Sequence, residues 1–395
     1  MDEKNYVVVT GSGRDRPGIT AAFAGILVAH GVDVVDIDQA ALHDFLGLSF
    51  LLDLGAAGGA KDTVIKDLLF EANRLGMQLS FQLLSEKELS HKKDKNLFVL
   101  TFFGDTRVLA EVAGTLGEEG ANIEKITNLS LRSAHCIELT IDARRVPSLA
   151  RLRERLMKRS HELNIDLALQ KMEAYRKSKR VVFFDMDRTL IDMEVIDEMA
   201  RAAGTWDEVH RVTEKAMRGD LDFEDSLRQR TALLKGLRLS ELEKIRDRIR
   251  ISEGARDLTR TLKKLGYRLG VVSGGFQFFA DHLMATLDLD FAYANELEIK
   301  ASALTGRISG DIIDDARKAR LVNQVSREMG IVLDQAVAIG DGANDRLMLG
   351  QAGLGIAYNA HMGLEKAASM NLGHTRLMNI LYVLGITEED VETAT

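Results

Sequence analysis

Apolar and polar positions in the first part of the chain predict a strand, a helix and a second strand. Residues 6–10 form an apolar run that leads into a polar, glycine-rich turn, which is typical of a strand end. Beyond the turn, Ile19, Phe23 and Leu27 recur at helical spacing, and Gly31 can end the helix before an apolar strand pattern resumes. These positions predict one small α+β unit.

The same pattern occurs a second time further along the chain. Residues 97–103 are apolar, Val112 and Leu116 share one helical face, and the segment 120–126 resembles the segment 31–37. The two copies are too far apart for a solenoid repeat, so two tandem small domains explain them better. We therefore expect two ferredoxin-like α+β domains in the first half of the chain.

A third pattern follows these two copies. Short apolar runs alternate with helical segments, as in a doubly wound parallel sheet, and the interval 194–250 has apolar residues at helical spacing throughout. We predict domains at residues 1–88, 95–172 and 180–386, with the polar stretch 85–95 as the first linker. The third domain is expected to be a Rossmann-like parallel sheet with a helical cap at about 194–250.

The composition limits the classes of function. The chain has 395 residues, of which 46% are hydrophobic and 28% are charged, as in ordinary globular proteins. Its formal net charge of -8 argues against a nucleic-acid partner, because a phosphate backbone attracts basic surfaces. No apolar run approaches the ~20 residues of a membrane span, and the amino terminus lacks a signal-peptide pattern, so we expect a cytoplasmic protein without a membrane partner.

Carboxylates follow two of the apolar runs in the third domain. Asp185 and Asp187 come directly after the run 181–184, and alternate residues of a strand end project to the same side. The two anions repel each other, and a magnesium ion would relieve that repulsion. Asp341 lies between two glycines after the run 335–339, so it is a candidate third ligand.

Groups that can bind a phosphoryl oxygen follow the same strand ends. Ser273 and Gly274 end a third apolar run and offer a hydroxyl and free N–H groups, and Lys318 can supply a positive charge. Each feature alone is more often a solvated strand end, a turn or a surface lysine. Their common order along the chain argues against an inert protein.

Together these segments resemble the four motifs of the haloacid dehalogenase-like hydrolase superfamily. Within it, the run from Thr189 to Glu194 and a cap that contains Phe223 and Arg230 resemble the phosphoserine phosphatases. The resemblance implies hydrolysis of O-phosphoserine to serine and phosphate, the last step of serine biosynthesis, through an aspartyl-phosphate on Asp185.

The same resemblance assigns roles to the remaining residues. Asp187 is the acid and then the base, and its main-chain carbonyl joins Asp185 and Asp341 as ligands of Mg²⁺. Glu194 and Arg230 bind the ammonium and carboxylate groups of the substrate. The phosphoryl oxygens are stabilised by Ser273, Gly274, Lys318 and Asn344. The same group of residues keeps Lys318 and the ion in position.

One residue departs from the family pattern. Phosphoserine phosphatases commonly have serine after the second aspartate, whereas this chain has Arg188. A long cation beside the nucleophile could change the shape of the pocket or pair with Asp187. Two alternatives therefore stay open: a phosphatase or phosphotransferase for another small phosphate ester, and a non-catalytic amino-acid sensor on an inactive hydrolase fold.

The glycine-rich turn after the first strand of the first domain can be interpreted in two ways. Gly11 and Gly13 follow a strand as in a dinucleotide-binding motif, but Arg16 stands where the third glycine should be. The turn 15–18 and the helix and strand after it instead resemble ACT domains, which often bind amino acids at paired interfaces. The resemblance implies an amino-acid effector, with serine as the candidate, or domains that only hold a homodimer together.

Overall fold

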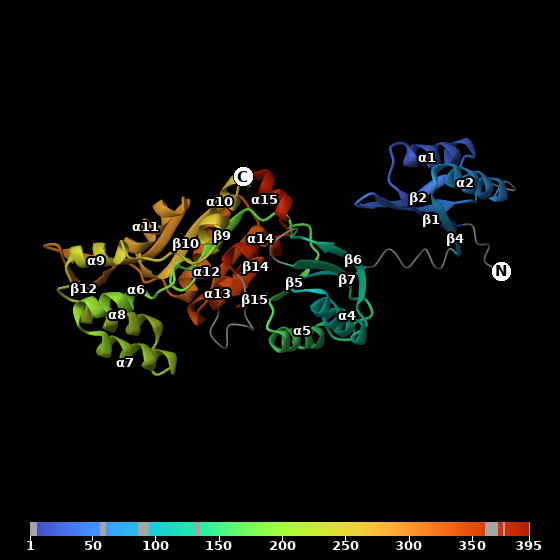
Figure 1. The fold of residues 1–395 in the computed structure, drawn as a ribbon. Coiled ribbons are helices and arrows are strands. Elements are labelled where there is room, and N and C mark those ends of the chain that lie inside the picture. Colours follow the sequence, from blue (N-terminus) through green and yellow to red (C-terminus); the bar gives the residue numbers. More distant parts are fainter. Residues whose placement is uncertain are drawn as a thin grey trace. The chain divides into compact units, whose positions relative to one another are not determined.

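The computed structural model describes residues 6–55, 61–85, 95–130, 135–359, 370–373 and 376–394. It separates into two compact units, residues 1–95 and 96–395, which are described in turn (Figure 1). Most of the predicted first linker, 85–95, lies outside the described residues. Within the described ranges, no helix is both long enough and apolar enough to span a bilayer.

The first unit has the predicted ferredoxin-like plan. Its elements are β1 (Tyr6–Arg14), α1 (Ile19–Ala29), β2 (Asp33–Leu42), β3 (Phe45–Asp53), α2 (Lys61–Leu75) and β4 (Gln78–Leu84). The strands form an antiparallel sheet in the order β2-β3-β1-β4. Val7 and Val9 alternate with more exposed residues along β1, and they share a core with Phe23 of α1 and Leu68 of α2. Helices α1 and α2 therefore cover one face of the sheet.

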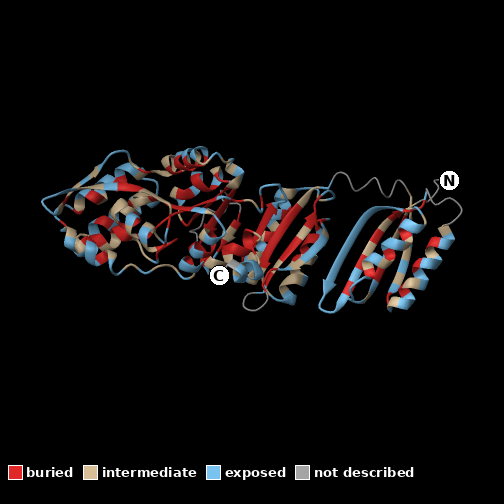
Figure 2. Cartoon of the chain, turned by 90° about the horizontal axis from the view of Figure 1, so that it is seen from above, coloured by how far each residue is buried: buried red, intermediate tan, exposed pale blue. Residues whose placement is uncertain are grey.

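The second unit opens with the same plan. Its first elements are β5 (Leu97–Phe103), α4 (Thr106–Glu118), β6 (Asn122–Asn128), β7 (Cys136–Asp142), α5 (Leu149–Leu163) and β8 (Leu167–Lys171). The strand order β8-β5-β7-β6 repeats that of the first unit. Buried residues gather in the strands and on the helix faces turned toward them (Figure 2).

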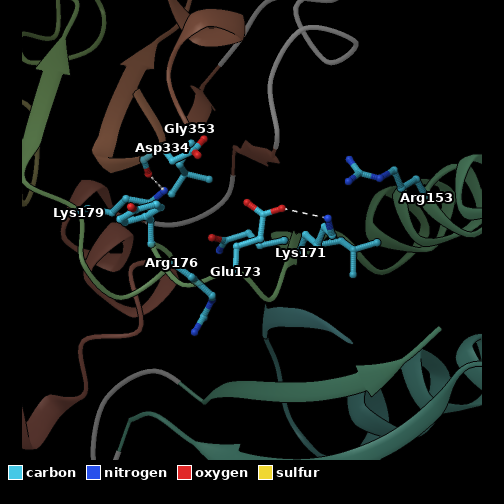
Figure 3. Close-up of a pocket in the computed structure, with 11 residues that line it drawn as sticks. Arg153, Lys171, Glu173, Arg176, Lys179, Asp334 and Gly353 are labelled. Carbon is cyan, nitrogen blue, oxygen red and sulfur yellow. Dashed lines mark hydrogen bonds and ion pairs between the residues drawn. The ribbon is translucent and has the colours of Figure 1, made fainter. Parts of the chain in front are cut away.

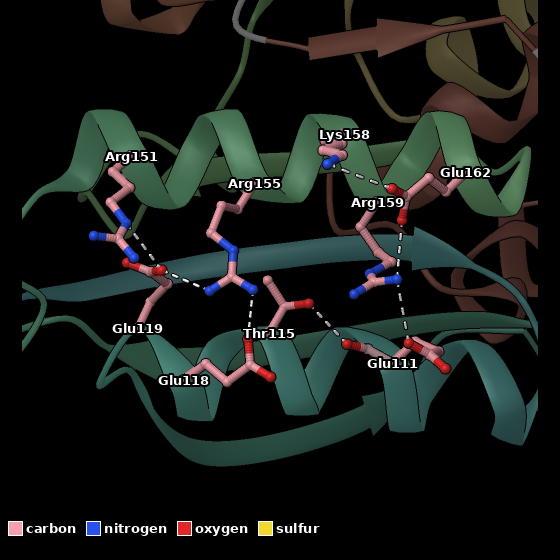
Figure 4. A network of polar contacts seen from close by, with 9 residues as sticks. All are labelled: Glu111, Thr115, Glu118, Glu119, Arg151, Arg155, Lys158, Arg159 and Glu162. Carbon is pink, nitrogen blue, oxygen red and sulfur yellow. Dashed lines mark hydrogen bonds and ion pairs between the residues drawn. The ribbon is translucent and has the colours of Figure 1, made fainter.

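Ion pairs join the two helices of this second copy. Arginines of α5 face glutamates of α4, as Figure 4 shows. Glu119 is buried and accepts from Arg155 at 2.7 Å, with Arg151 at 3.2 Å. The side-chain hydrogen bond from Arg155 holds the pKa of Glu119 below its ordinary value. The register between α4 and α5 is thus set by charge as well as by apolar packing.

The remainder of the second unit is a three-layer α/β fold. Its strands are β9 (Val181–Phe184), β10 (Arg268–Phe276), β11 (Phe291–Lys300), β12 (Ala303–Ser309), β13 (Ala336–Gly340), β14 (Leu354–Tyr358) and β15 (Met370–Leu372). They are ordered β12-β11-β10-β9-β13-β14-β15 and run parallel from β11 to β15, with β12 antiparallel at the edge. The predicted parallel sheet is confirmed.

Helices cover both faces of the central strand β9. Val182 and Phe184 belong to an apolar cluster with α10 (Ala255–Lys264) and α11 (Gln277–Thr286). Val181 and Phe183 belong to another cluster with α12 (Asp315–Glu328) and α13 (Arg346–Gln351). Because both faces are covered, β9 is apolar at every position, as buried parallel strands are.

Four helices follow β9 in the interval that we predicted as the cap. They are α6 (Val195–Ala203), α7 (Trp206–Met217), α8 (Phe223–Leu233) and α9 (Leu239–Arg246). Three short helical segments, η5 (Leu377–Asn379), α14 (Ile380–Val383) and α15 (Glu388–Ala394), end the chain. The domain boundaries given above remain predictions.

The second ferredoxin-like sheet continues into the α/β sheet, which the sequence did not predict. β8 pairs antiparallel with β15 through Ala168 and Met370, so the two form one sheet of eleven described strands. The segment 173–179, between the second and third predicted domains, lies beside β8 and β14. It lines a pocket of about 180 Å³, shown in Figure 3, where Lys179 donates to the main-chain oxygen of Asp334 at 2.5 Å.

A buried ion pair fastens that segment to the sheet. Arg176 follows β8 and pairs with Glu138 of β7, and their side chains are 5% and 11% exposed. We expect Glu138→Ala to lower the free energy of unfolding of residues 96–395 by about 3 kcal/mol, because it leaves a buried guanidinium without its counter-charge. Urea unfolding followed by circular dichroism measures this loss.

The matched control for this substitution is Glu118→Ala. Glu118 also pairs with an arginine, Arg155, but its side chain is 63% exposed. Its removal should therefore cost less than about 1 kcal/mol. Equal losses for the two substitutions would contradict the special role of the buried pair.

Candidate active site

Three neighbouring strands bring the predicted residues to one edge of the sheet. Asp185 follows β9, Asp341 follows β13, and Ser273 lies in the last part of β10. Because these strands are adjacent and parallel, their carboxyl ends lie side by side, and the amide of Asp185 donates to Ile339 of β13 at 2.8 Å. The predicted positions of these three residues at adjacent strand ends are therefore found in the structure.

A buried lysine links two of the carboxylates. Lys318, on the first turn of α12, places Nζ 2.6 Å from Oδ1 of Asp185 and 2.7 Å from Oδ1 of Asp345. Asp345 is fully buried and also accepts from the amide of Gly342 at 3.1 Å. The pair of carboxylates outweighs the effect of burial and raises the pKa of Lys318 above its ordinary value.

Asp345 is a site residue to which sequence reasoning gave no role. We expected Asn344 to hold Lys318 in register, but the structure gives that contact to Asp345. Asn344 is half-buried in the short helix η3 (Ala343–Asp345), and its side chain folds back over Gly342. The signal was available, since a buried lysine at the centre of the site needs more than one negative partner.

The side chains of Asp185, Asp341 and Asp345 form an oxygen-rich cluster. One carboxylate oxygen from each lies within 4.8 Å of the others, and all three residues are buried. Burial, together with the charges of Asp185 and Asp345, raises the pKa of Asp341 to about 8. Burial and the charge of Asp185 likewise raise the pKa of Asp345 to about 6.

These pKa shifts have a simple physical reading. One lysine does not neutralise the three carboxylates, so ionising the last of them is costly. A divalent cation with oxygen ligands would remove that cost, and a set of carboxylate donors without nitrogen or sulfur suits Mg²⁺. The cluster therefore fits a metal ion of this class.

Asp187 has different surroundings from Asp185. Its Oδ1 accepts from the amide of Val195 at the start of α6 at 2.9 Å, so its carboxyl group points toward the cap helices. Burial, then the charges of Glu194 and Asp185, raise the pKa of Asp187 well above its ordinary value. A carboxyl group with a raised pKa holds its proton more tightly, which suits it to act as a general acid.

The backbone of the Ser-Gly-Gly segment lies against Asp187. A side-chain carbon placed on Gly275 would come within 2.8 Å of Oδ2 of Asp187 and 2.6 Å of Cε of Met186. A side chain at this position would have to displace Met186 or the carboxyl group of Asp187. The hydroxyl of Ser273 accepts from the amide of Gly275 at 2.9 Å, which fixes the local turn. Gly275 is therefore a further residue that shapes the site.

Asn295, at the end of the buried half of β11, also fixes this segment and was missed by sequence reasoning. Its Nδ2 donates to the carbonyl of Gly274 at 2.8 Å, and its Oδ1 accepts from the amide of Ile313 at 2.8 Å. The side chain thus joins the phosphate-binding turn to the segment that leads into α12 and Lys318. Asn295 lies in the hairpin of β11 and β12, which was not predicted, and a single asparagine forms no motif that would mark it in the sequence.

We expect Asn295→Ala to lower kcat by about tenfold to a hundredfold with little change in KM. The substitution leaves the carbonyl of Gly274 and the amide of Ile313 without this partner. The positions of the phosphate-binding turn and Lys318 relative to each other are then no longer fixed. Steady-state phosphate release measures the effect. Asn323→Ala is the control, because Asn323 lies on α12 and its amide donates to Ala319 of the same helix.

The cap helices carry the predicted substrate-binding residues, which lie close to the carboxylates and to the Ser-Gly-Gly segment. Phe223 begins α8 and packs on Gly274, where an added side-chain carbon would come within 2.8 Å of its ring. Arg230, on the last turn of α8, donates to the carbonyl of Ser226 at 3.4 Å. Burial lowers the pKa of Arg230, while the charges of Glu194 and Asp197 oppose that shift. Asp197 is an acidic neighbour that was not predicted.

Glu194 forms an ion pair with Arg188, the residue that departs from the family pattern. Nε of Arg188 lies 3.1 Å from Oε1 of Glu194, and both side chains are part-exposed. Burial raises the pKa of Glu194, and the charge of Arg188 is the largest influence that opposes this. Arg188 has φ of 54°, so its backbone is left-handed, and its side chain contacts the residue that precedes α6.

Comparison with known proteins agrees with this arrangement. Residues 182–350 match the haloacid dehalogenase-like hydrolase family, and residues 5–82 and 99–170 each match ACT domains. The predicted superfamily and both ACT-like domains are thus confirmed.

Relatives of the full chain share one name. A phosphoserine phosphatase of Streptomyces coelicolor is 40% identical over 97% of this chain and 92% of its own length. One of Archaeoglobus fulgidus is 41% identical over 80% of this chain and 92% of its own length. A solved structure titled as a phospho-aspartyl intermediate analogue of phosphoserine phosphatase is 41% identical, with a TM-score of 0.50 over 52% of this chain and 98% of that one. The chain belongs to the phosphoserine phosphatase family of haloacid dehalogenase-like hydrolases.

Proposed function

We propose that this chain hydrolyses O-phosphoserine to serine and phosphate through an aspartyl-phosphate on Asp185, as the last step of serine biosynthesis. The observation that carries the proposal is the contact of Asp185 with buried Lys318, beside a second, protonatable aspartate, Asp187. A nucleophile, a fixed cation and an acid at one sheet edge are the parts that phosphoryl transfer needs.

In the first step, a carboxylate oxygen of Asp185 attacks phosphorus in line with the serine oxygen. The bond between phosphorus and that oxygen breaks, and Asp187 gives its proton to the leaving oxygen, which would otherwise depart as an alkoxide. The raised pKa of Asp187 keeps this proton available. Lys318, Ser273 and the amide of Gly274 stabilise the charge on the phosphoryl oxygens.

In the second step, Asp187 acts as the base. It takes a proton from water, and the water oxygen forms a bond to phosphorus while the bond to Asp185 breaks, which releases phosphate. Asp187 is then protonated and Asp185 is free, as at the start. The hydrogen bond from the amide of Val195 keeps Asp187 in place for both transfers.

Magnesium is the metal that fits the site best. Asp185, Asp341 and the main-chain carbonyl of Asp187 would hold it, with Asp345 held by Lys318 beside them. The bound ion would stabilise negative charge on the phosphoryl group as a Lewis acid. Loss of activity on exhaustive chelation and its return with Mg²⁺ would support this assignment.

The charged residues of the cap suit a zwitterionic substrate. Glu194 can bind an ammonium group, and the planar guanidinium of Arg230 can bind both oxygens of a carboxylate. Each influences the pKa of the other, which supports a position of the two charges close to each other. A phosphate ester with both an ammonium and a carboxylate group matches this pair.

A panel of phosphate esters, assayed with and without Mg²⁺, tests the proposal. Phosphoserine, phosphothreonine, phosphoethanolamine and 3-phosphoglycerate differ in the groups that Glu194 and Arg230 would recognise. The expected result is the highest kcat/KM for phosphoserine, and only with the metal. A higher kcat/KM for another ester would show that this ester is the substrate, while the proposed reaction through Asp185 would still stand.

We further propose that the ACT domains bind an amino-acid effector, with serine as the candidate, and that they form a homodimer. What supports the dimer is β2, an edge strand whose ten residues are all exposed, Val35 and Ile37 among them. Serine should then change both the activity and the melting temperature. If serine changes neither, while sedimentation shows a dimer, the domains serve assembly alone.

A further inference from the structure

Arg188 stands next to the residue that would receive the substrate's ammonium group. Its guanidinium lies 3.1 Å from the carboxylate of Glu194, and its side chain is 45% exposed. Glu194 directly precedes Val195, whose amide donates to Oδ1 of Asp187 at 2.9 Å, and its charge also contributes to the raised pKa of Asp187. The ion pair therefore lies beside the proposed catalytic acid.

The charge balance of the pocket depends on this pair. Without Arg188, Glu194 would be a half-buried anion close to Asp185 and Asp187, and a negatively charged ester would meet its repulsion. A substrate with an ammonium group brings its own positive charge for Glu194. A substrate without one depends on a cation that the protein supplies.

We propose that Arg188 is a specificity-determining residue that occupies Glu194 in place of the substrate's ammonium group and so lets the enzyme accept phosphate esters that lack one. This inference rests on the proposed function. When phosphoserine binds, its ammonium group displaces the guanidinium from Glu194. When an ester without the ammonium group binds, Arg188 stays on Glu194 and keeps the pocket neutral at that point.

The experiment compares two esters that differ only in the ammonium group. These are phosphoserine and 3-phosphooxypropanoate, and the quantity measured is the ratio of their kcat/KM values. Arg188→Gln removes the charge and shortens the side chain, so the ratio should rise about tenfold in favour of phosphoserine, because the bare carboxylate of Glu194 repels the other ester. Arg188→Lys keeps the charge and should stay within about threefold of the wild-type ratio.

Two further variants separate this role from a general effect on the cap. Arg228→Gln removes an arginine of similar exposure that pairs with Glu224 on α8, and it should leave the ratio unchanged. In a Glu194→Gln background, Arg188→Gln should have no further effect on the ratio, because the repelling charge is already gone.

The outcomes are distinct. A ratio in Arg188→Gln within twofold of wild type, or equal shifts in the Gln and Lys variants, overturns the inference and leaves the proposed function standing. A wild-type enzyme that hydrolyses p-nitrophenyl phosphate and neither of the two esters overturns the proposed function, and the inference with it.

Discussion

Replacing Asp185 by asparagine is expected to lower kcat/KM for phosphoserine by at least about 10⁴-fold. An amide cannot attack phosphorus, and the loss of a nucleophile removes the covalent route altogether. Phosphate release measures the loss of turnover. Intact-protein mass spectrometry after acid quenching should show one added phosphoryl group in the wild type during turnover and none in the variant.

The fold should survive this substitution. Lys318 keeps its contact with Asp345 at 2.7 Å, and one negative charge leaves a cluster that has too many. The melting temperature without metal should therefore not fall. Asp192→Asn is the matched control, because Asp192 is exposed in the loop that follows the nucleophile, and its activity should match the wild type. A phosphorylated Asp185→Asn protein would show that another residue is the nucleophile.

Much of this site could be predicted because its residues follow apolar strands. Runs such as 181–184 and 335–339 identify buried parallel strands, and parallel strands bring their carboxyl ends together whatever the intervening chain does. The positions of Asp185 and Asp341 followed from that rule alone. Glu194 and Arg230 needed the family resemblance, since a charged residue on a helix is usually exposed to solvent.

Contacts that depend on tertiary packing could not be predicted in this way. The pairing of β8 with β15 joins segments about two hundred residues apart, and no local pattern records which strand edges meet. Asn295 acts through two hydrogen bonds to distant backbone, and its neighbours along the chain give no sign of them. Arg188 has a left-handed backbone, a conformation that sequence reasoning assigns to glycine or asparagine before arginine, and its contact with Glu194 is visible only in the folded chain.

The second large effect is expected from Asp341, and it depends on pH. The pKa of Asp341 is raised from 3.8 to about 8, so the folded protein holds this proton more tightly than the unfolded chain does. The stability that the proton contributes is fully present below the unfolded pKa, and it is lost as pH rises through about 8. The melting temperature of the metal-free protein should therefore fall between pH 5 and pH 8.5, and the unfolding free energy should fall with it by an amount on the order of 4 kcal/mol.

Asp341→Asn tests this by removing the titrating group. Its metal-free form should lose most of the decline with pH and be more stable than the wild type at pH 8, although it should have almost no activity. Asp311→Asn, an exposed carboxylate before α12, should keep the wild-type pH dependence. An unchanged decline in the Asp341 variant would place the titration on another group.

Magnesium should act on the same proton in the opposite direction. The metal needs Asp341 in its ionised form, so binding releases a proton, and the apparent Kd of Mg²⁺ should fall about tenfold per pH unit between pH 6 and pH 7.5. Because the ion binds only the folded state, its stabilising effect on melting should be larger at pH 8 than at pH 6. Titration calorimetry in buffers of different ionisation enthalpy measures the released proton directly. A Kd that does not change with pH would mean that Asp341 is already ionised without the metal, and the pKa shift would then have no part in metal binding.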